Sequence, residues 1–221
     1  AEAAHAKGAL VYIDNTFCTP IYQNPLELGA DFVMHTASKY LGGHSDIIGG
    51  SLTVKDPELG KRVRTIREQI GSIIGPMEGW LMMRGLRTLE VRVKEHGKTA
   101  LAVAQYLEQH PKVKKVYYTG LASHPQHELI EKQQSGHTGL LSFELDSTTQ
   151  EAKEFCQALR IFKIGVSWGG FESLVMMPYA REDEETCKKM GAGQNVIRIH
   201  CGLEGTENLI EDLEQAFQQV F

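Results

Sequence analysis

The sequence lacks the features that mark several classes of protein. Its four cysteines, among 221 residues, form no C-x-x-C pair, so we expect free thiols in a reducing cytoplasm rather than a disulfide framework. Its apolar runs are too short to cross a bilayer, which argues against a membrane protein. It has no lysine and arginine cluster, and its formal net charge is −5. Nucleic acid is therefore not an expected partner.

The composition that remains, 42% hydrophobic and 23% charged residues, is typical of a soluble globular protein with one large or two small domains. Residues 1–8 read as the tail of a helix that ends at Gly8. A strand at 9–14, a brief helix at 25–30 and a strand at 31–36 then predict a parallel βαβ unit. Two parallel strands do not make a stable sheet. We therefore expect the chain to begin inside a domain whose N-terminal half is absent.

The rest of the chain alternates helices and strands. Apolar residues recur at threes and fours from 76 to 109, which predicts a helix of about 50 Å that links two domains, with a bend near Gly97. Other expected elements are strands at 47–55, 113–118, 139–145, 162–167 and 195–202, and helices at 57–71 and 206–217. We predict a first region, residues 1–85, from a parallel-sheet domain. The second region, residues 86–221, would hold the linking helix and a small α+β domain.

Polar side chains follow both strands of the βαβ unit. Asp14 ends the first strand and Lys39 follows the second, and parallel strands bring these ends to one edge of the sheet. Thr36 and Ser38 add two hydroxyl groups. An amine for a Schiff base, a carboxylate for a ring nitrogen and hydroxyls for a phosphate are what pyridoxal phosphate (PLP) requires. The alternatives are an Asp14–Lys39 ion pair, or a buried Asp14 that accepts backbone N–H groups.

Residues 12–50, YIDNTFCTPIYQNPLELGADFVMHTASKYLGGHSDIIGG, closely resemble the signature of the Cys/Met-metabolism family of PLP-dependent enzymes. That family includes cystathionine γ-synthase, the cystathionine γ- and β-lyases and methionine γ-lyase. The resemblance continues in WLMMRGLRTLEVR, SHPQHEL, SWGGFESL and IRIHCGLE. It implies an α/β fold of the type I, aspartate-aminotransferase-like class. The chain would hold the C-terminal part of the large PLP-binding domain and the small α+β C-terminal domain.

The resemblance also implies roles for single residues. Lys39 would form the Schiff base with PLP and then act as the base that moves protons at the substrate. Asp14 would hold the pyridine nitrogen, and Thr36 and Ser38 would hold the phosphate. The family is tetrameric, so a homotetramer is implied as well.

Two positions near the C-terminus are implied to bind the substrate. Arg198 alternates with apolar residues in the strand at 195–202, and its planar guanidinium suits a carboxylate; the family uses an arginine here. Ser167 resembles the family serine that helps to hold the same carboxylate. The alternatives are a surface arginine and a turn serine before paired glycines. His124 and His127 are separated by Pro125 without a third ligand, so no metal site is expected.

These residues predict PLP-dependent cleavage of a C–S bond in a sulfur amino acid, cystathionine or a relative, by β- or γ-elimination. Trp168 and RIHCGLE resemble the β-lyases, whereas TGLASHPQHEL resembles the γ-lyases. One alternative is a γ-replacement enzyme of the same family, of the cystathionine γ-synthase or homoserine sulfhydrylase type. A second is an inactive fragment that serves only as an assembly or binding module. The absent N-terminal half is expected to leave this chain inactive by itself.

Overall fold

The chain divides into two compact units. The computed structural model describes the backbone of residues 1–221 and the side chains of all residues except Glu184 and Lys188. The first unit comprises Ala1–Val91 and Glu131–Gly136, and the second comprises Arg92–Ile130 and His137–Phe221. The assignment of residues 1–85 to a cofactor-binding domain stays a prediction.

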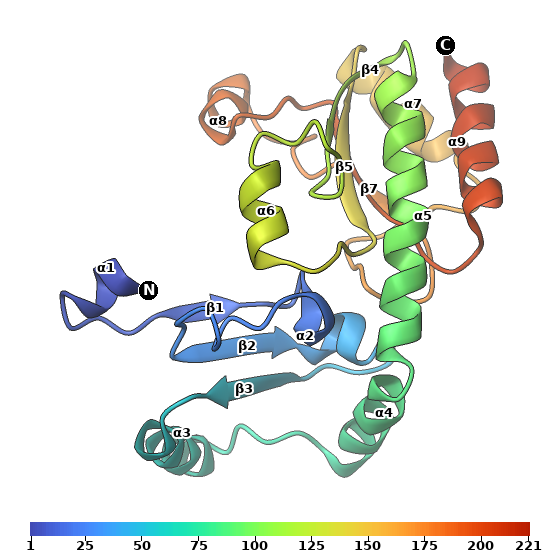
Figure 1. The fold of residues 1–221 in the computed structure, drawn as a ribbon. Coiled ribbons are helices and arrows are strands. Elements are labelled where there is room, and N and C mark those ends of the chain that lie inside the picture. Colours follow the sequence, from blue (N-terminus) through green and yellow to red (C-terminus); the bar gives the residue numbers. More distant parts are fainter. The chain divides into compact units, whose positions relative to one another are not determined.

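A three-stranded sheet with the order β1-β2-β3 organises the first unit (Figure 1). Strands β1 (Tyr12–Asp14) and β2 (Phe32–Thr36) are parallel, and β3 (Gly50–Val54) is antiparallel to β2. The predicted parallel pair is therefore confirmed. Because parallel strands point the same way, Asp14 at the end of β1 and Lys39 after β2 follow the same edge of the sheet.

Short helices flank β1. Helix α1 (Glu2–His5) precedes it, and the chain then turns through Gly8, whose φ is 71°. Helix α2 (Thr19–Tyr22) follows it. The helix predicted at residues 25–30 is wrong, because this stretch forms turns and Gly29, with a φ of 98°, stops any helix after a single turn.

The single helix predicted from 76 to 109 is also wrong. The structure has two helices here, α4 (Pro76–Leu86) and α5 (Leu89–Gln109), and the break lies at residues 87–88 instead of Gly97. The amides of residues 87 and 88 donate to carbonyls three residues back, at 3.2 Å each, which tightens and ends α4. The described residues contain no helix with the length and apolar character needed to cross a membrane. The remaining helices are α3 (Pro57–Ile70), α6 (His127–Gln133), α7 (Thr149–Ala158), α8 (Glu184–Met190) and α9 (Thr206–Val220).

The second unit contains a five-stranded sheet in the order β4-β5-β8-β7-β6. Its strands are β4 (Val113–Tyr117), β5 (Leu140–Leu145), β6 (Lys163–Ile164), β7 (Leu174–Met176) and β8 (Val196–His200). Neighbouring strands are antiparallel, except that β6 and β7 are parallel. Strand β7 was not predicted, because three residues are too few to show an alternating pattern.

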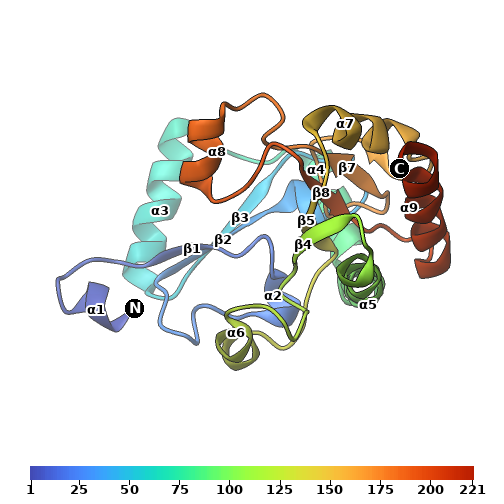
Figure 2. The same ribbon diagram turned by 90° about the horizontal axis from the view of Figure 1, so that it is seen from above.

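One face of this sheet packs against α5, α7 and α9 (Figure 2). Phe155 of α7 lies at the centre of this core, where its ring is 6.2 Å from the ring of Phe143 and 4.6 Å from that of Phe217. Ile197 and Ile199 of β8 face the same core and are fully buried. The predicted apolar face of this strand is therefore confirmed, and alternate residues of β8 belong to the opposite face.

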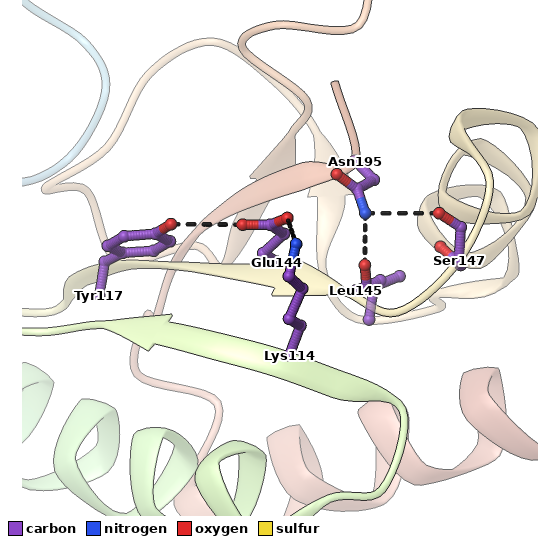
Figure 3. A network of polar contacts seen from close by, with 6 residues as sticks. All are labelled: Lys114, Tyr117, Glu144, Leu145, Ser147 and Asn195. Atoms are coloured by element: carbon purple, nitrogen blue, oxygen red, sulfur yellow. Dashed lines mark hydrogen bonds and ion pairs between the residues drawn. The ribbon is translucent and has the colours of Figure 1, made fainter. Parts of the chain in front are cut away.

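A polar network joins β4, β5 and the residues before β8 (Figure 3). A register shift in β4 accompanies Lys114, whose Nζ lies 2.8 Å from the carboxylate of Glu144. Tyr117 donates to the second carboxylate oxygen at 3.3 Å. Asn195 donates to two main-chain carbonyls, one at the end of β5 and one just after it. These contacts compensate the nearly buried charge of Glu144 and fix the start of β8 against β5.

Candidate functional site

Lys39 lies in a tight turn that directly follows β2. The turn spans Ala37–Leu41, and its backbone is kinked at Lys39, whose φ of −98° and ψ of −133° are not helical. Gly49 holds this turn, since its carbonyl accepts from the amide of Ala37 at 2.8 Å and its amide donates to the hydroxyl oxygen of Ser38 at 3.2 Å. The half-buried Lys39 thus projects from a fixed backbone.

The carboxylate of Asp14 is tied to β2 through Thr16. Its Oδ1 accepts from the amide of Thr16 at 3.0 Å and from the hydroxyl at 2.6 Å. The Thr16 hydroxyl has a single hydrogen, so it accepts the amide of Thr36, at 2.7 Å, through its oxygen. Within the part of the chain that the structure describes, Oδ2 of Asp14 has no hydrogen-bond partner. Asp14 is exposed, so this oxygen is open to a ligand.

A second polar pair lies beside this chain of contacts. Asn15, which is 2% exposed, donates from Nδ2 to the carbonyls of Thr19 and Gln23 at 3.2 and 3.0 Å. Because carbonyls only accept, this orientation of the amide is fixed, and His35 Nε2, at 3.2 Å from Nδ2, must act as an acceptor. Burial lowers the pKa of His35, and the charge of Asp14 offsets this only in part. His35 is therefore neutral near pH 7.

Helix α4 closely approaches the turn that carries Lys39. We call residues 37–42 the lysine turn, and a side chain on the helix would not fit at this contact. A Cβ atom on Gly85 would lie 2.3 Å from the carbonyl oxygen of Gly42 and 2.6 Å from that of Leu41. Real Cβ atoms do not approach main-chain oxygens so closely. Glycine at position 85 therefore allows the helix to support the backbone that carries Lys39.

The substrate residues predicted near the C-terminus lie together in the second unit. Arg198 is half-buried on the face of β8 opposite the core, between Ser142 of β5 and Met176 of β7 in the register. Its Nη2 donates at 2.5 Å to the carbonyl of Val166, the residue before Ser167. Burial lowers the pKa of Arg198, which starts so high that the guanidinium stays charged. A fixed cation beside Ser167 is suited to a carboxylate.

The sequence model for the family described as "Cys/Met metabolism PLP-dependent enzyme" matches residues 1–218 of this chain. The chain belongs to this family. It is 39% identical to a cystathionine gamma-lyase of Dictyostelium discoideum, over 99% of this chain and 58% of that protein. It is 42% identical to the human cystathionine gamma-lyase, over 99% of this chain and 55% of that protein. A cystathionine beta-lyase of Lactococcus lactis subsp. cremoris is 40% identical, over 98% of this chain and 58% of that protein.

The solved structures of the family confirm the predicted α/β fold class. The structure of cystathionine gamma synthase from Xanthomonas oryzae pv. oryzae in complex with aminoacrylate and cysteine matches with a TM-score of 0.94 at 37% identity. The match covers 99% of this chain and 58% of that one. The chain therefore spans between 55% and 58% of the length of these relatives.

The residues of the first unit fit the cofactor of a PLP-dependent family. The open Oδ2 of Asp14 can accept the N–H of a protonated pyridine ring. Lys39 supplies an amine from the turn that follows β2, which ends at the same edge of the sheet as β1. The hydroxyl of Ser38 accepts from Gly49, so its own hydrogen is available to a phosphate oxygen. The hydroxyl of Thr36 points to the sulfur of Met34 at 3.8 Å, a weak acceptor that a phosphate can replace.

Sequence reasoning missed the residues that hold the predicted cofactor-binding side chains in place. Thr16, Asn15 and His35 touch Asp14 or its neighbours through the contacts above and were not singled out. The one local signal was the spacing of Asp14 and Thr16, since an aspartate often accepts from the amide two residues later. That signal indicates a turn. It does not show that the threonine hydroxyl joins two strands.

Proposed function

We propose that this chain carries cofactor- and substrate-binding residues of a PLP-dependent carbon–sulfur lyase that acts on cystathionine or a related sulfur amino acid. The observation that carries the proposal is the open carboxylate oxygen of Asp14 at the sheet edge that Lys39 follows. Relatives named cystathionine gamma-lyase and cystathionine beta-lyase support the reaction class. When bound, PLP would supply an electron sink for the negative charge that develops at the substrate Cα.

Residues of the first unit would hold the cofactor. Lys39 would bind its aldehyde carbon through the side-chain amine, and Asp14 would keep the ring nitrogen protonated. Thr16 would orient Asp14, because its hydroxyl and amide both donate to Oδ1. Thr36 and Ser38 would donate their hydroxyl hydrogens to the phosphate.

Lys39 would also act on the substrate. After a substrate amine had displaced it from the cofactor, the Lys39 amine would act as the base that removes the proton from Cα. Loss of the thiolate from Cβ would then follow directly, whereas loss from Cγ would first require removal of a proton from Cβ. Lys39 would return a proton to the leaving thiolate. Holding this amine in a fixed turn favours the transfer, because proton transfer requires hydrogen-bond reach.

Residues of the second unit would hold the substrate carboxylate. Arg198 would donate from its guanidinium, and Ser167 would add its amide or hydroxyl. The bond from Arg198 to the carbonyl of Val166 restricts the guanidinium to one orientation and brings it beside Ser167. We expect Arg198→Lys to raise the KM for the amino-acid substrate at least about 10-fold, because a lysine cannot reproduce two parallel hydrogen bonds.

Borohydride reduction tests the cofactor site directly. After incubation with PLP and reduction, we expect the intact mass of the chain to rise by one reduced cofactor, with Lys39→Ala unlabelled. Thr16→Val should lower labelling at limiting PLP, whereas Thr16→Ser, which keeps the hydroxyl, should not. Equal labelling of the wild-type chain and Lys39→Ala would show that PLP reacts with surface amines and would refute the assignment.

A γ-replacement enzyme is the second candidate, and the likeness to cystathionine gamma synthase favours it. Steady-state kinetics separate the two, using the product of the complete reading frame with cystathionine as substrate. Release of ketoacid and ammonia without an added thiol supports the lyase. A strict requirement for an added thiol supports replacement. An inactive assembly module predicts no Lys39-dependent labelling by PLP at all.

Cellular location and assembly complete the proposal. All four cysteines are buried free thiols, which suits a reducing cytoplasm. The resemblance to the family favours a homotetramer, and sedimentation velocity of the complete protein tests this. A monomer at working concentration would contradict it.

A further inference from the structure

The segment that carries Ser167, residues 166–173, is held at both ends. We call it the serine segment. Its first carbonyl accepts from Arg198 at 2.5 Å. At its other end, the carboxylate of Glu204 accepts from the amide and from the hydroxyl of Ser173, at 2.7 Å each. Arg198 lies in β8 and Glu204 lies four residues after its end, so β8 and the residues that follow it determine where the serine segment lies.

The middle of the serine segment is held by a histidine. Gly169 has a φ of 82°, which turns the chain sharply, and the next carbonyl, that of Gly170, meets Nε2 of His200 at 3.0 Å. A carbonyl only accepts, so Nε2 must carry a hydrogen and donate it. His200 is the last residue of β8 and is 1% exposed. The bond is therefore shielded from water, and water cannot replace it if it is lost.

A second buried imidazole lies beside the first. The rings of His96 and His200 are 5.0 Å apart, and Nδ1 of His96 donates to the carbonyl of Cys201 at 2.8 Å. Thus each histidine donates one hydrogen to a main-chain carbonyl. Only the hydrogen bond from His200 reaches the serine segment. The two histidines therefore form a matched pair that donates to carbonyls in different segments.

We propose that His200 is a positioning residue for the substrate carboxylate site, because its Nε2–H holds the Gly170 carbonyl and so fixes Ser167. The proposal rests on the proposed role of Ser167 and Arg198 in binding that carboxylate. Without the donor, the Gly170 carbonyl is buried without its partner, and the turn at Gly169 relaxes. The amide of Leu203 still donates to the Phe171 carbonyl at 2.8 Å, so the segment stays attached, but Ser167 is held less closely. Nothing that contacts the substrate has been changed.

Two reciprocal pairs of variants test this role. A glutamine side chain places its amide nitrogen near the Nε2 position of histidine, whereas asparagine places it near Nδ1. His200→Gln therefore keeps the donor to Gly170, and His200→Asn removes it. At His96 the relation is reversed, because Asn keeps the donor to Cys201 and Gln removes it. Both pairs change a buried imidazole to an amide, so they share the general cost of the substitution.

Kinetics of the PLP-loaded product of the complete reading frame provide the first measurement. We expect His200→Asn to raise the KM for the amino-acid substrate about 10-fold with little change in kcat, because an unsatisfied buried carbonyl loosens the turn. His200→Gln should restore the KM to within about threefold of wild type. The two His96 variants should not differ in KM. Equal KM values for His200→Asn and His200→Gln would overturn the proposal.

Hydrogen–deuterium exchange of the 221-residue chain separates this proposal from the function on which it rests. We expect faster exchange in residues 166–173 for His200→Asn than for His200→Gln. If exchange does not distinguish them, His200 does not hold the segment and the proposal fails. If exchange differs but neither His200→Asn nor Arg198→Lys raises the KM, the segment is held as described. The carboxylate site itself is then wrong.

Discussion

The two units keep their site residues in place by different means. In the second, Arg198 stands on the central strand of a sheet whose other face is packed against α5, α7 and α9. In the first, Asp14 and Lys39 are held by hydrogen bonds from threonine, serine and glycine and by the close approach of α4. Many large apolar side chains of the first unit are exposed instead of buried. Those on α3, on α4 and between them include Ile66, Ile70, Ile73, Met77, Trp80 and Met83.

This difference indicates where each unit is vulnerable. Burial of apolar surface is the main source of stability, so the second unit depends on its core. The first unit buries less of its apolar surface and depends more on specific polar and backbone contacts around the lysine turn. Damage to the second unit should therefore appear in the free energy of unfolding. Damage to the first should appear more strongly in capture of PLP.

The largest effect is expected in the core of the second unit. Phe155→Ala removes a fully buried ring that contacts Phe143 and Phe217, and should lower the free energy of unfolding by about 4 kcal/mol. Ile66→Ala, at a side chain 54% exposed in α3, should cost less than about 1 kcal/mol. Urea denaturation followed by circular dichroism measures both. Similar losses for the two variants would show that Ile66 is covered in solution. The two units would then not differ in how they bury apolar side chains.

Asp212 should give the next largest effect. It is 4% exposed in α9, and its carboxylate accepts from the amides of Arg160, Ile161 and Phe162 at 2.8, 2.8 and 3.1 Å. Asp212→Ala leaves these amides without an acceptor and should cost about 3 kcal/mol. Asp212→Asn keeps one acceptor oxygen and should cost less. If Asp212→Asn lost as much stability as Asp212→Ala, the negative charge, rather than the position of the acceptor oxygens, would hold residues 160–162.

The buried histidine pair of the second unit predicts that stability depends on pH. Burial lowers the pKa of His96 from 6.5 to about 4 and that of His200 to about 3. Arg92 adds to the lowering at His96, and Arg198 adds to it at His200. At any pH between these lowered pKa values and 6.5, the two histidines bind more protons in the unfolded chain than in the folded chain. Stability is therefore complete above pH 6.5 and falls as the pH decreases toward 4.

The size of this loss is on the order of 2 to 3 kcal/mol for His96 alone. Urea denaturation at about pH 7 and about pH 4.5 measures it. Carboxylates also titrate in this range, so the double variant His96→Asn, His200→Gln serves as the control, because it keeps both donors and cannot be protonated. An equal loss of stability in the double variant would assign the pH dependence to the carboxylates and to His35 and His110, whose pKa burial also lowers.

The sequence allowed the main frame of the site to be predicted, because that frame is local. Asp14 and Lys39 each follow a short apolar strand, and a parallel connection alone brings their ends to one edge. The position of Arg198 followed from the alternation of β8, and its inner face is confirmed. The catalytic and binding roles of these residues stay predictions, and the borohydride and kinetic experiments test them.

The parts that could not be predicted depend on contacts between distant residues. Asn15 meets His35 twenty positions away, and Thr16 joins Asp14 to the amide of Thr36. The break between α4 and α5 was missed because apolar residues keep the helical spacing across it. Gly85 reads as a weak point in a helix, and only its nearness to the Gly42 carbonyl explains it.

The smallest effect in stability gives the sharpest test of the first unit. Gly79 and Gly85 both lie in α4. A Cβ on Gly79 would meet Ile74 at 4.0 Å, an ordinary contact, so Gly79→Ala should stabilise the chain by about 0.5–1 kcal/mol. Gly85→Ala pushes against two main-chain oxygens of the lysine turn and should cost about 1–2 kcal/mol.

Capture of PLP should separate these two variants further than stability does. Moving the turn displaces Lys39, so Gly85→Ala should be labelled far less than the wild-type chain after borohydride reduction at limiting PLP. Gly79→Ala should be labelled as the wild type is. If Gly85→Ala loses stability but keeps full labelling, the turn adapts and backbone contacts do not limit the site. Because the two substitutions add the same methyl group to the same helix, propensity cannot account for a difference between them, and only the contact with the lysine turn remains as its cause.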